Sequence, residues 1–197
     1  MAVLAIALPP AKADVLYVGS QDGECCFNVA LTQITSTEVQ VEVTVTDGAL
    51  YFVDTGSGQH PGFGFNITGD PSITISGLSS PWTSTDAHTT SVTTGGPSLG
   101  TFDYFIDNPG PGSSKHNGGP LIFDVSVSSG TLSVNDFTDN ASGYYFVSDI
   151  YGSDGNTGLS GINVPGTSTV PEPSSLLWLL PALAAIGGKR AWLKRPA

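Results

Sequence analysis

Basic residues are scarce in this chain of 197 residues, which holds 6 Lys and Arg against 17 Asp and Glu. Only Lys115 lies between Asp14 and Asp154, a stretch that carries sixteen of the acidic residues. Such a body repels phosphate backbones and anionic lipids, and its charge keeps an exported protein soluble. We therefore expect no nucleic-acid partner. Apart from Lys12, the other basic residues gather at the C-terminal end: Lys189, Arg190, Lys194 and Arg195.

Motifs for metals and cofactors are absent from the sequence. No histidine has a zinc-type ligand two to four residues downstream, and no Asp-x-Asp-x-Asp-Gly calcium loop occurs. The chain also lacks a phosphate loop, a dinucleotide fingerprint and a Ser, His and Asp order typical of hydrolases. We expect no cofactor and no metal centre. The histidines considered as metal ligands are His60, His88 and His116. The residues considered as oxygen ligands of a loose calcium site are Asp103, Asp107 and Asn108.

Cysteine is limited to one adjacent pair, Cys25 and Cys26. Neighbouring residues of a strand point to opposite faces, and their Cα atoms are about 3.8 Å apart. That separation lies below the usual disulfide range of about 4.4 to 6.8 Å. We expect one buried thiol and one free thiol, with a bond between molecules as the alternative in an oxidising compartment.

Long apolar runs are absent before Leu176, and 25 Gly and 14 Pro interrupt the shorter ones. The run from Val39 to Thr46 alternates perfectly between valine and polar residues, which is the pattern of a half-buried strand. Many short strands separated by turn residues predict an all-β fold, an antiparallel two-sheet sandwich of jelly-roll-like type. We predict strands at 14–18, 27–34, 39–46, 50–53, 62–67, 72–75, 101–106, 121–127, 131–137 and 144–150.

Turn and loop signals complete this prediction. Asp47-Gly48 predicts a hairpin that joins strand 39–46 to strand 50–53. Two long Gly-rich segments, 108–120 and 153–161, are predicted as loops, and loops on a rigid sandwich are where binding sites are usually found.

The segment Phe52-Val53-Asp54-Thr55-Gly56-Ser57 has the letters of an aspartic protease loop. That chemistry needs two carboxylates that share a proton, and the chain holds no second Asp-Ser/Thr-Gly. A second copy of the chain would have to supply the second carboxylate. Such a dimer also needs a downstream apolar-apolar-Gly segment to support the loop, and residues 73–77 match that pattern poorly. We therefore expect Asp54 to end a strand and to accept local backbone hydrogen bonds. A hydrolase that uses Asp54 is the least favoured function.

The N-terminal segment 1–13 has a short apolar run and ends in Ala11-Lys12-Ala13, the small-x-small pattern of a secretory cleavage site. We expect a signal peptide with cleavage after Ala13. A positively charged start is missing, so we expect either that the true start lies upstream or that the export signal is weak.

The C-terminal segment has three parts. We expect Val170-Pro171-Glu172-Pro173 to be extended, because proline lacks the N–H and restrains its neighbour. An uncharged Leu and Ala run follows, and then the basic cluster. The helix expected from Ser174 to Gly188 is about 22 Å long, short for a hydrocarbon core of roughly 30 Å, so the basic residues would snorkel. Their charge belongs on the cytoplasmic side, which places the acidic body outside.

This order resembles the PEP-CTERM sorting signal of exported bacterial proteins, a tail also catalogued as the C-terminal domain of ice-binding proteins. The resemblance implies recognition by a membrane-embedded exosortase, cleavage near Pro-Glu-Pro and release to the cell surface or extracellular matrix. Pro181 within the helix and the split Lys and Arg cluster depart from the family pattern. The resulting organisation is a truncated signal peptide at 1–13, an exported β-sandwich domain at 14–165, a linker with the motif at 166–173, and a transmembrane helix with a basic cytoplasmic tail at 174–197.

The function expected from these features is that of a non-catalytic surface or matrix protein. It is held at the inner membrane by its C-terminal helix and then released to the cell surface or medium. Its expected partners are the membrane, the exosortase and an extracellular polysaccharide. The alternative is a carbohydrate- or ice-binding module; ice binding would need a flat Thr-x-Thr array, which the irregular strands do not predict.

Overall fold

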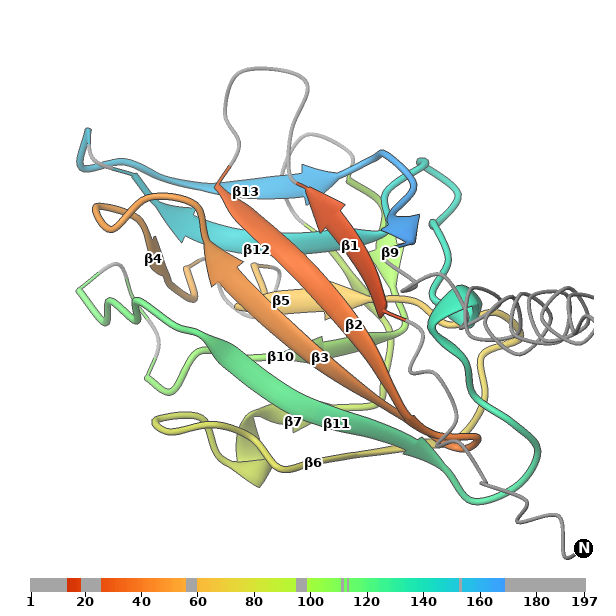
Figure 1. The fold of residues 1–197 in the computed structure, drawn as a ribbon. Coiled ribbons are helices and arrows are strands. Elements are labelled where there is room, and N and C mark those ends of the chain that lie inside the picture. The colour runs from red at the N-terminus through yellow and green to blue at the C-terminus, as the bar shows by residue number, and fades with distance from the viewer. Residues whose placement is uncertain are drawn as a thin grey trace, which may run out of the picture. The chain divides into compact units, whose positions relative to one another are not determined.

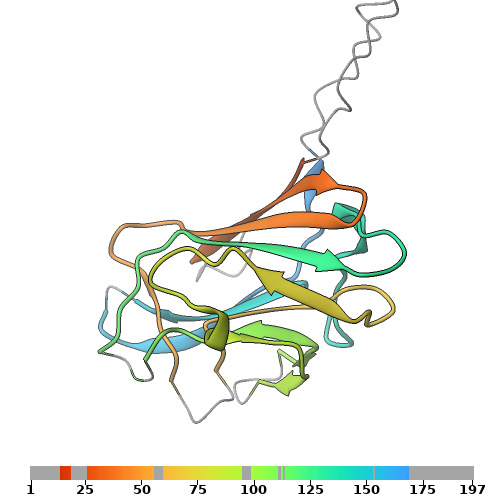
Figure 2. The same ribbon diagram turned by 90° about the horizontal axis from the view of Figure 1, so that it is seen from below.

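The computed structural model describes residues 14–18, 26–55, 60–94, 99–110, 112, 114–152 and 154–168, which all lie in one compact unit. These residues form antiparallel β-strands and two short 3₁₀ helices, η1 (Ser84–Asp86) and η2 (Val134–Asp136), with no α-helix among them. Two sheets lie over one another as two layers (Figures 1 and 2). The predicted all-β, antiparallel sandwich is confirmed.

The first sheet has six strands in the order β14, β1, β2, β3, β11, β6. Alternation explains its long strands: Val39, Val41 and Val43 of β3 are fully buried, whereas Glu42 between them is exposed. Hydrogen bonds pair β3 with β2 on one side and β11 on the other. The strands are β14 (Thr167–Ser168), β1 (Asp14–Val18), β2 (Phe27–Thr35), β3 (Glu38–Val45), β11 (Leu121–Val127) and β6 (Ile73–Ser76).

The second sheet has the order β13, β12, β5, β10, β7, with β4 also paired to β12. A separate two-stranded pair, β8 and β9, precedes β10 in the chain. The strands are β13 (Thr157–Ile162), β12 (Phe146–Tyr151), β5 (Phe63–Phe65), β10 (Tyr104–Ile106), β7 (Ala87–His88), β4 (Tyr51–Phe52), β8 (Val92–Thr93) and β9 (Thr101–Phe102).

Aromatic side chains fill the space between the two sheets. Phe63 of β5 stacks on Phe146 of β12 with ring centroids 5.7 Å apart, and it meets Phe123 of β11 edge-on at 6.0 Å. Phe65 packs against the same Phe123 at 5.8 Å. Because these rings are fully buried and come from both sheets, they form the centre of the hydrophobic core.

Three of the local predictions are wrong. Strands β3 and β4 form no hairpin, since β4 lies in the other sheet and pairs with β12. Segment 131–137 is no strand: it contains η2, where the N–H of Ser133 donates to the Asp136 carboxylate at 2.6 Å. Segment 153–161 is not all loop, because β13 begins at Thr157 and pairs with β12 along its length.

The predictions for the two ends of the chain concern residues outside the described ranges, so they stay predictions. They comprise the signal cleavage at Ala13, the motif Val170, Pro171, Glu172 and Pro173, the helix at 174–197, and the basic residues Lys189, Arg190, Lys194 and Arg195. Within the described ranges, no helix is long and apolar enough to cross a membrane. Cys26 is partly buried and packs against the core, whereas Cys25 falls outside the described part.

Candidate functional site

A fully buried carboxylate, Asp149, makes polar contacts with Thr55 and His60. It belongs to β12, where Ser148 and Asp149 interrupt an otherwise apolar strand, and both side chains are fully buried. One carboxylate oxygen of Asp149, Oδ2, accepts hydrogen bonds from the backbone N–H of Thr55, at 2.8 Å, and from the Thr55 hydroxyl. Charge-assisted hydrogen bonds of this kind are the means by which a protein retains a buried carboxylate.

Hydrogen bonds with Ser148 and Asp149 of β12 hold both ends of segment 53–62. The N–H of Val53 donates to the carbonyl of Asp149 at 3.0 Å, and the N–H of Asp149 donates to the carbonyl of Pro61 at 3.1 Å. The Ser148 hydroxyl also donates to the carbonyl of Gly62. Strand β12 therefore fastens the segment that follows β4 to the segment that enters β5.

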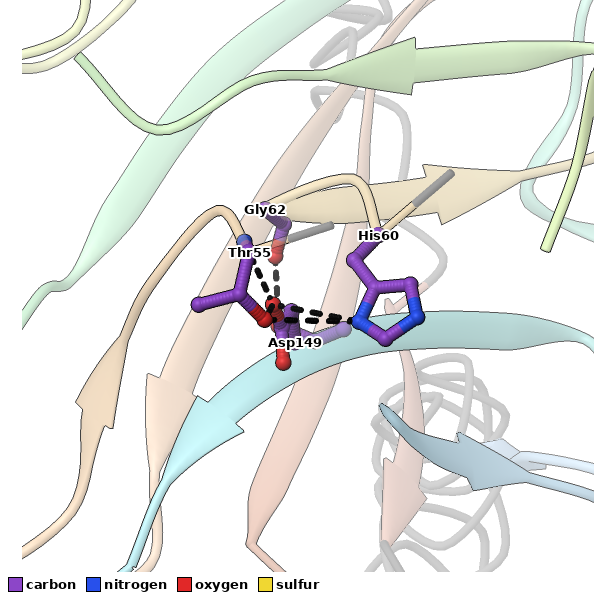
Figure 3. A network of polar contacts seen from close by, with 5 residues as sticks. Thr55, His60, Gly62 and Asp149 are labelled. Atoms are coloured by element: carbon purple, nitrogen blue, oxygen red, sulfur yellow. Dashed lines mark hydrogen bonds and ion pairs between the residues drawn. The ribbon is translucent and has the colours of Figure 1, made fainter. Parts of the chain in front are cut away.

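His60 faces the same carboxylate. Its Nδ1 lies 3.6 Å from Oδ2 of Asp149 and 3.4 Å from the Thr55 hydroxyl (Figure 3). The imidazole is about a quarter exposed, so water reaches it although Asp149 has no exposed surface. The second carboxylate oxygen, Oδ1 of Asp149, is buried and has no hydrogen-bond partner in the described structure.

Asp54 lies next to this network and is partly exposed. Burial, with the nearby negative charges of Asp107 and Asp149, raises its pKa from 3.8 to about 6, although His60 and His88 oppose the shift. Burial also raises the pKa of Asp149. Like charges and a low local dielectric favour the protonated acid, so Asp54 holds a proton at mildly acidic pH.

Asp107 is the third carboxylate of this region, after Asp149 and Asp54. It follows β10, and its Oδ2 lies 3.0 Å from Nε2 of His88. Burial raises its pKa and His88 opposes that shift. A glycine brings its segment close: a Cβ on Gly62 would lie 2.9 Å from the backbone nitrogen of Asn108 and 3.0 Å from the carbonyl oxygen of Ile106. Only glycine therefore allows this approach of the two chain segments.

The sequence motif Asp-Thr-Gly-Ser showed no second carboxylate near Asp54, whereas the structure places Asp107 and Asp149 close to it. Strand β4 ends at Phe52, so Asp54 follows a strand end as predicted. The acceptor of the local N–H and hydroxyl groups is Asp149, however, which is 94 residues from Thr55 in the chain. The only signal for Asp149 in the sequence was a pair of polar residues inside an apolar strand.

The other sequence candidates have separate surroundings. His116 stacks between Tyr51 and Tyr151, with centroid distances of 4.9 and 4.1 Å, so the three histidines do not converge. The residues considered as oxygen ligands of calcium also have separate contacts. The Asn108 amide donates a hydrogen bond to the carbonyl of Lys115, and the N–H of Asp103 donates one to Oδ1 of Asn66. Among the residues that the structure describes, no three His, Cys, Asp or Glu side chains form a set that could hold a metal ion.

The chemistry of this cluster follows from its burial. Asp149 has no exposed surface and both donors of Thr55 occupy its Oδ2, so it cannot approach a substrate in this arrangement. Asp54 is partly exposed and titrates near pH 6. The geometry therefore fits a fastened loop with one exchangeable proton better than a pair of catalytic carboxylates.

Comparisons with protein-family models, with curated proteins and with solved structures found no match for this chain.

Proposed function

We propose that the chain is an exported, non-catalytic surface or extracellular-matrix protein that carries a PEP-CTERM sorting signal. The observation that carries this proposal is the order of the C-terminal segment: Pro171-Glu172-Pro173, an uncharged apolar run from Leu176, and the basic residues from Lys189. Each part has a physical role, since proline stops the helix, the apolar run enters the bilayer and the basic cluster stays in the cytoplasm.

The proposed route begins with export and anchoring at the inner membrane by the C-terminal helix. An exosortase then cuts near Pro-Glu-Pro, and the acidic body reaches the cell surface or the medium. Support comes from the charge distribution, because the bases are concentrated beyond the apolar run and the acids precede it. The exported unit is the β-sandwich, whose jelly-roll subtype and following helix remain predictions.

A second candidate function is a carbohydrate-binding module. It is favoured by a polar pocket of about 380 Å³ beside β5 and β9, which Asn66, Asp70, Asp103, Asp139 and Asn140 help to line. Ice binding receives less support, because the exposed threonine pair that faces across two strands, Thr93 and Thr101, lies on the two-residue strands β8 and β9. A hydrolase based on Asp54 stays the least favoured function.

The test is mass spectrometry of the mature termini after expression in a bacterium with an active exosortase and in its exosortase deletion strain. We expect the product from the active strain to lack everything after Pro-Glu-Pro and to appear in the envelope or medium. The same experiment with Glu172→Ala should retain the intact tail, whereas Glu38→Ala, a change of the same kind in β3, should be processed normally. Full-length membrane-bound protein in both strains would refute the proposal.

A further inference from the structure

The turn between β5 and β6 holds Asp70 in a backbone conformation that side chains rarely adopt. Its φ is 46°, and among the residues that the structure describes it is the one non-glycine residue with a positive φ. The N–H of Asp70 closes the turn by donating to the carbonyl of Ile67 at 3.1 Å. The residue before it, Gly69, has a φ of 81°. Glycine adopts such values freely, whereas they are unfavourable for an aspartate.

The residue after Asp70 adds to this strain, because it is a proline. Pro71 and Asp70 form the one Asp-Pro pair of the whole sequence. A proline ring restricts the residue before it to extended conformations with a negative φ, so the positive φ of Asp70 is disfavoured for a second reason. Strained backbone persists only where the surrounding structure holds it, and it is concentrated at functional sites. Breaking the Asp70-Pro71 peptide bond would release this strain.

Tyr104 of β10 holds the strained peptide from both sides. Its hydroxyl hydrogen is shared between Oδ1 of Asp70, at 2.9 Å, and the carbonyl oxygen of Pro71, at 2.6 Å. The Tyr104 ring is buried and stacks on Phe65 with centroids 5.3 Å apart, which fixes the position of the hydroxyl. Burial and the hydrogen bond to Asp70 raise the pKa of Tyr104, so the hydroxyl keeps its proton. The carboxylate of Asp70 is therefore held next to its own peptide bond.

Water and protons reach this peptide from the polar pocket. Asp70 is exposed and lines the pocket together with Asp103 and Asp139. A pocket of about 380 Å³ is large enough to admit water. Burial and the charge of Asp70 raise the pKa of Asp103, although a hydrogen bond from Ser91 opposes the shift. Asp103 therefore takes up a proton more readily than an exposed aspartate as the pH falls.

We propose that the folded protein cleaves its own Asp70-Pro71 bond. The carboxylate of Asp70 attacks the main-chain carbonyl carbon of the same residue through Oδ2 and forms a cyclic anhydride. The bond from that carbon to the nitrogen of Pro71 breaks, and the nitrogen keeps the electron pair and takes a proton from the medium. Water then opens the anhydride, which leaves Asp70 as a new C-terminus with two carboxyl groups. The net reaction consumes one water molecule.

Two features of the Asp-Pro pair suit it to this reaction. The nucleophile and the carbonyl carbon belong to one residue, so the attack is intramolecular and requires no encounter. The nitrogen of Pro71 belongs to a tertiary amide. Its two alkyl substituents make it more basic than an ordinary peptide nitrogen, so it accepts more readily the proton that the leaving group needs. Release of the strained φ of Asp70 lowers the barrier further.

Cleavage would leave the sandwich assembled, because each fragment contributes strands to both sheets. The fragment before the bond supplies β1, β2 and β3 to the first sheet and β4 and β5 to the second. The fragment after it supplies β6, β11 and β14 to the first sheet and β7, β10, β12 and β13 to the second. Hydrogen bonds and the shared core therefore hold the two fragments together. This inference goes beyond the sorting proposal and does not depend on it.

The test is incubation of the purified full-length chain in mildly acidic buffer, folded and in concentrated urea, followed by denaturing gel electrophoresis and mass spectrometry. We expect one fragment that ends at Asp70 and one that begins at Pro71, and the two should elute together from a gel-filtration column under native conditions. The folded chain should cleave at least tenfold faster than the chain in urea, which corresponds to about 1.4 kcal/mol in the barrier. Equal rates, or no fragments from the folded chain, would overturn the proposal.

Hydroxylamine distinguishes self-cleavage from the action of a contaminating protease. It attacks the cyclic anhydride in place of water, so the first fragment should end in a hydroxamate of Asp70 when hydroxylamine is present. Direct attack of water on the peptide bond forms no anhydride and gives an ordinary carboxyl group. A first fragment that carries no hydroxamate would overturn the anhydride route.

Matched variants identify the nucleophile. Asp70→Asn removes the carboxylate and keeps a residue that tolerates a positive φ, so cleavage should slow at least tenfold. Asp139→Asn removes another carboxylate of the same pocket, away from the Asp-Pro bond, and should cleave at the unaltered rate. Cleavage of Asp70→Asn at the rate of Asp139→Asn would refute the proposed role of Asp70. None of these readouts involves the C-terminal tail, so this proposal and the sorting proposal can fail separately.

Discussion

Two groups of aspartates in this molecule differ in burial and in the number of hydrogen-bond donors that each carboxylate accepts. Asp149 has no exposed surface, and its Oδ2 takes both hydrogen-bond donors of Thr55. The pocket acids Asp70 and Asp139 are exposed, and the carboxylate of each accepts a single hydrogen bond from the described groups. The same side chain therefore holds a loop in one place and faces solvent in the other. Burial and hydrogen-bond donors, more than residue type, separate a structural carboxylate from one that is open to a ligand.

The largest effect is expected for Asp149→Ala. The change leaves the N–H and hydroxyl of Thr55 without acceptors in a buried site, so we expect the free energy of unfolding to fall by about 3 kcal/mol. Urea denaturation followed by fluorescence measures this loss. The matched control is Asp139→Ala in the pocket, which should change the value by less than about 0.5 kcal/mol. Equal losses in the two variants would erase the distinction between the two groups of carboxylates.

A smaller effect is expected for Thr55→Val, which removes the hydroxyl donor and keeps the backbone donor. The free energy of unfolding should fall by about 1 to 2 kcal/mol, because one charge-assisted hydrogen bond into a buried carboxylate is lost. Thr93→Val makes the same change on the exposed β8 and serves as the control. Thermal unfolding of both variants in parallel decides the matter, and an unchanged melting temperature for Thr55→Val would contradict the proposed role of this contact.

The pH dependence of stability sharpens the comparison further. The pKa of Asp54 rises from 3.8 to about 6 on folding, so the folded state binds its proton more tightly than the unfolded chain does. The contribution of protonated Asp54 to the free energy of unfolding is complete below about pH 4, and it is lost as the pH rises through 6. Asp54→Asn should therefore flatten the curve between pH 4 and 7 and raise the free energy of unfolding at pH 7.5 by about 1 kcal/mol, a figure reduced for the partial exposure of Asp54.

Chemical denaturation at several pH values measures this curve. Asp107 and Asp149 have pKa values raised in the same direction, so the slope should flatten without vanishing. Asp47→Asn in an exposed turn is the control. A curve for Asp54→Asn that follows the unaltered protein would show that Asp54 does not hold the proton.

The smallest effect on stability is expected for Asp70→Asn. Asparagine tolerates the positive φ of this position, and its side-chain oxygen can accept the Tyr104 hydroxyl as the carboxylate does. The free energy of unfolding should change by less than about 0.5 kcal/mol, by urea denaturation. A loss above about 2 kcal/mol would make Asp70 a structural carboxylate like Asp149.

Much of the sandwich could be predicted from alternation alone. The strands at 14–18 and 121–127 have the predicted bounds, because buried residues occupy alternate positions at 15 and 17 and at 121, 123 and 125. Segment 131–137 has similarly spaced apolar residues, yet the hydrogen bond between Ser133 and Asp136 turns it into η2. Strand β13 shows no alternation of buried and exposed residues. It is a strand because it pairs with β12, and no pattern in the sequence predicts that pairing.

The candidate site was only half visible in the sequence for the same reason. Asp54 stands in a recognisable motif, whereas Asp149 stands in an ordinary strand and joins Thr55 across 94 residues. No local pattern encodes a contact between such distant segments. The pocket was hidden as well, because its carboxylates come from the turn after β5, the residue after β9 and the segment after η2.

The attachment of segment 53–62 to β12 also bears on local opening. A loop amide usually exchanges its hydrogen with solvent through small local fluctuations. The N–H of Thr55 donates instead to a carboxylate on a fully buried part of β12, with strands paired along both of its edges. Its exchange requires the loss of this buried contact, so this residue should be better protected than an ordinary loop amide.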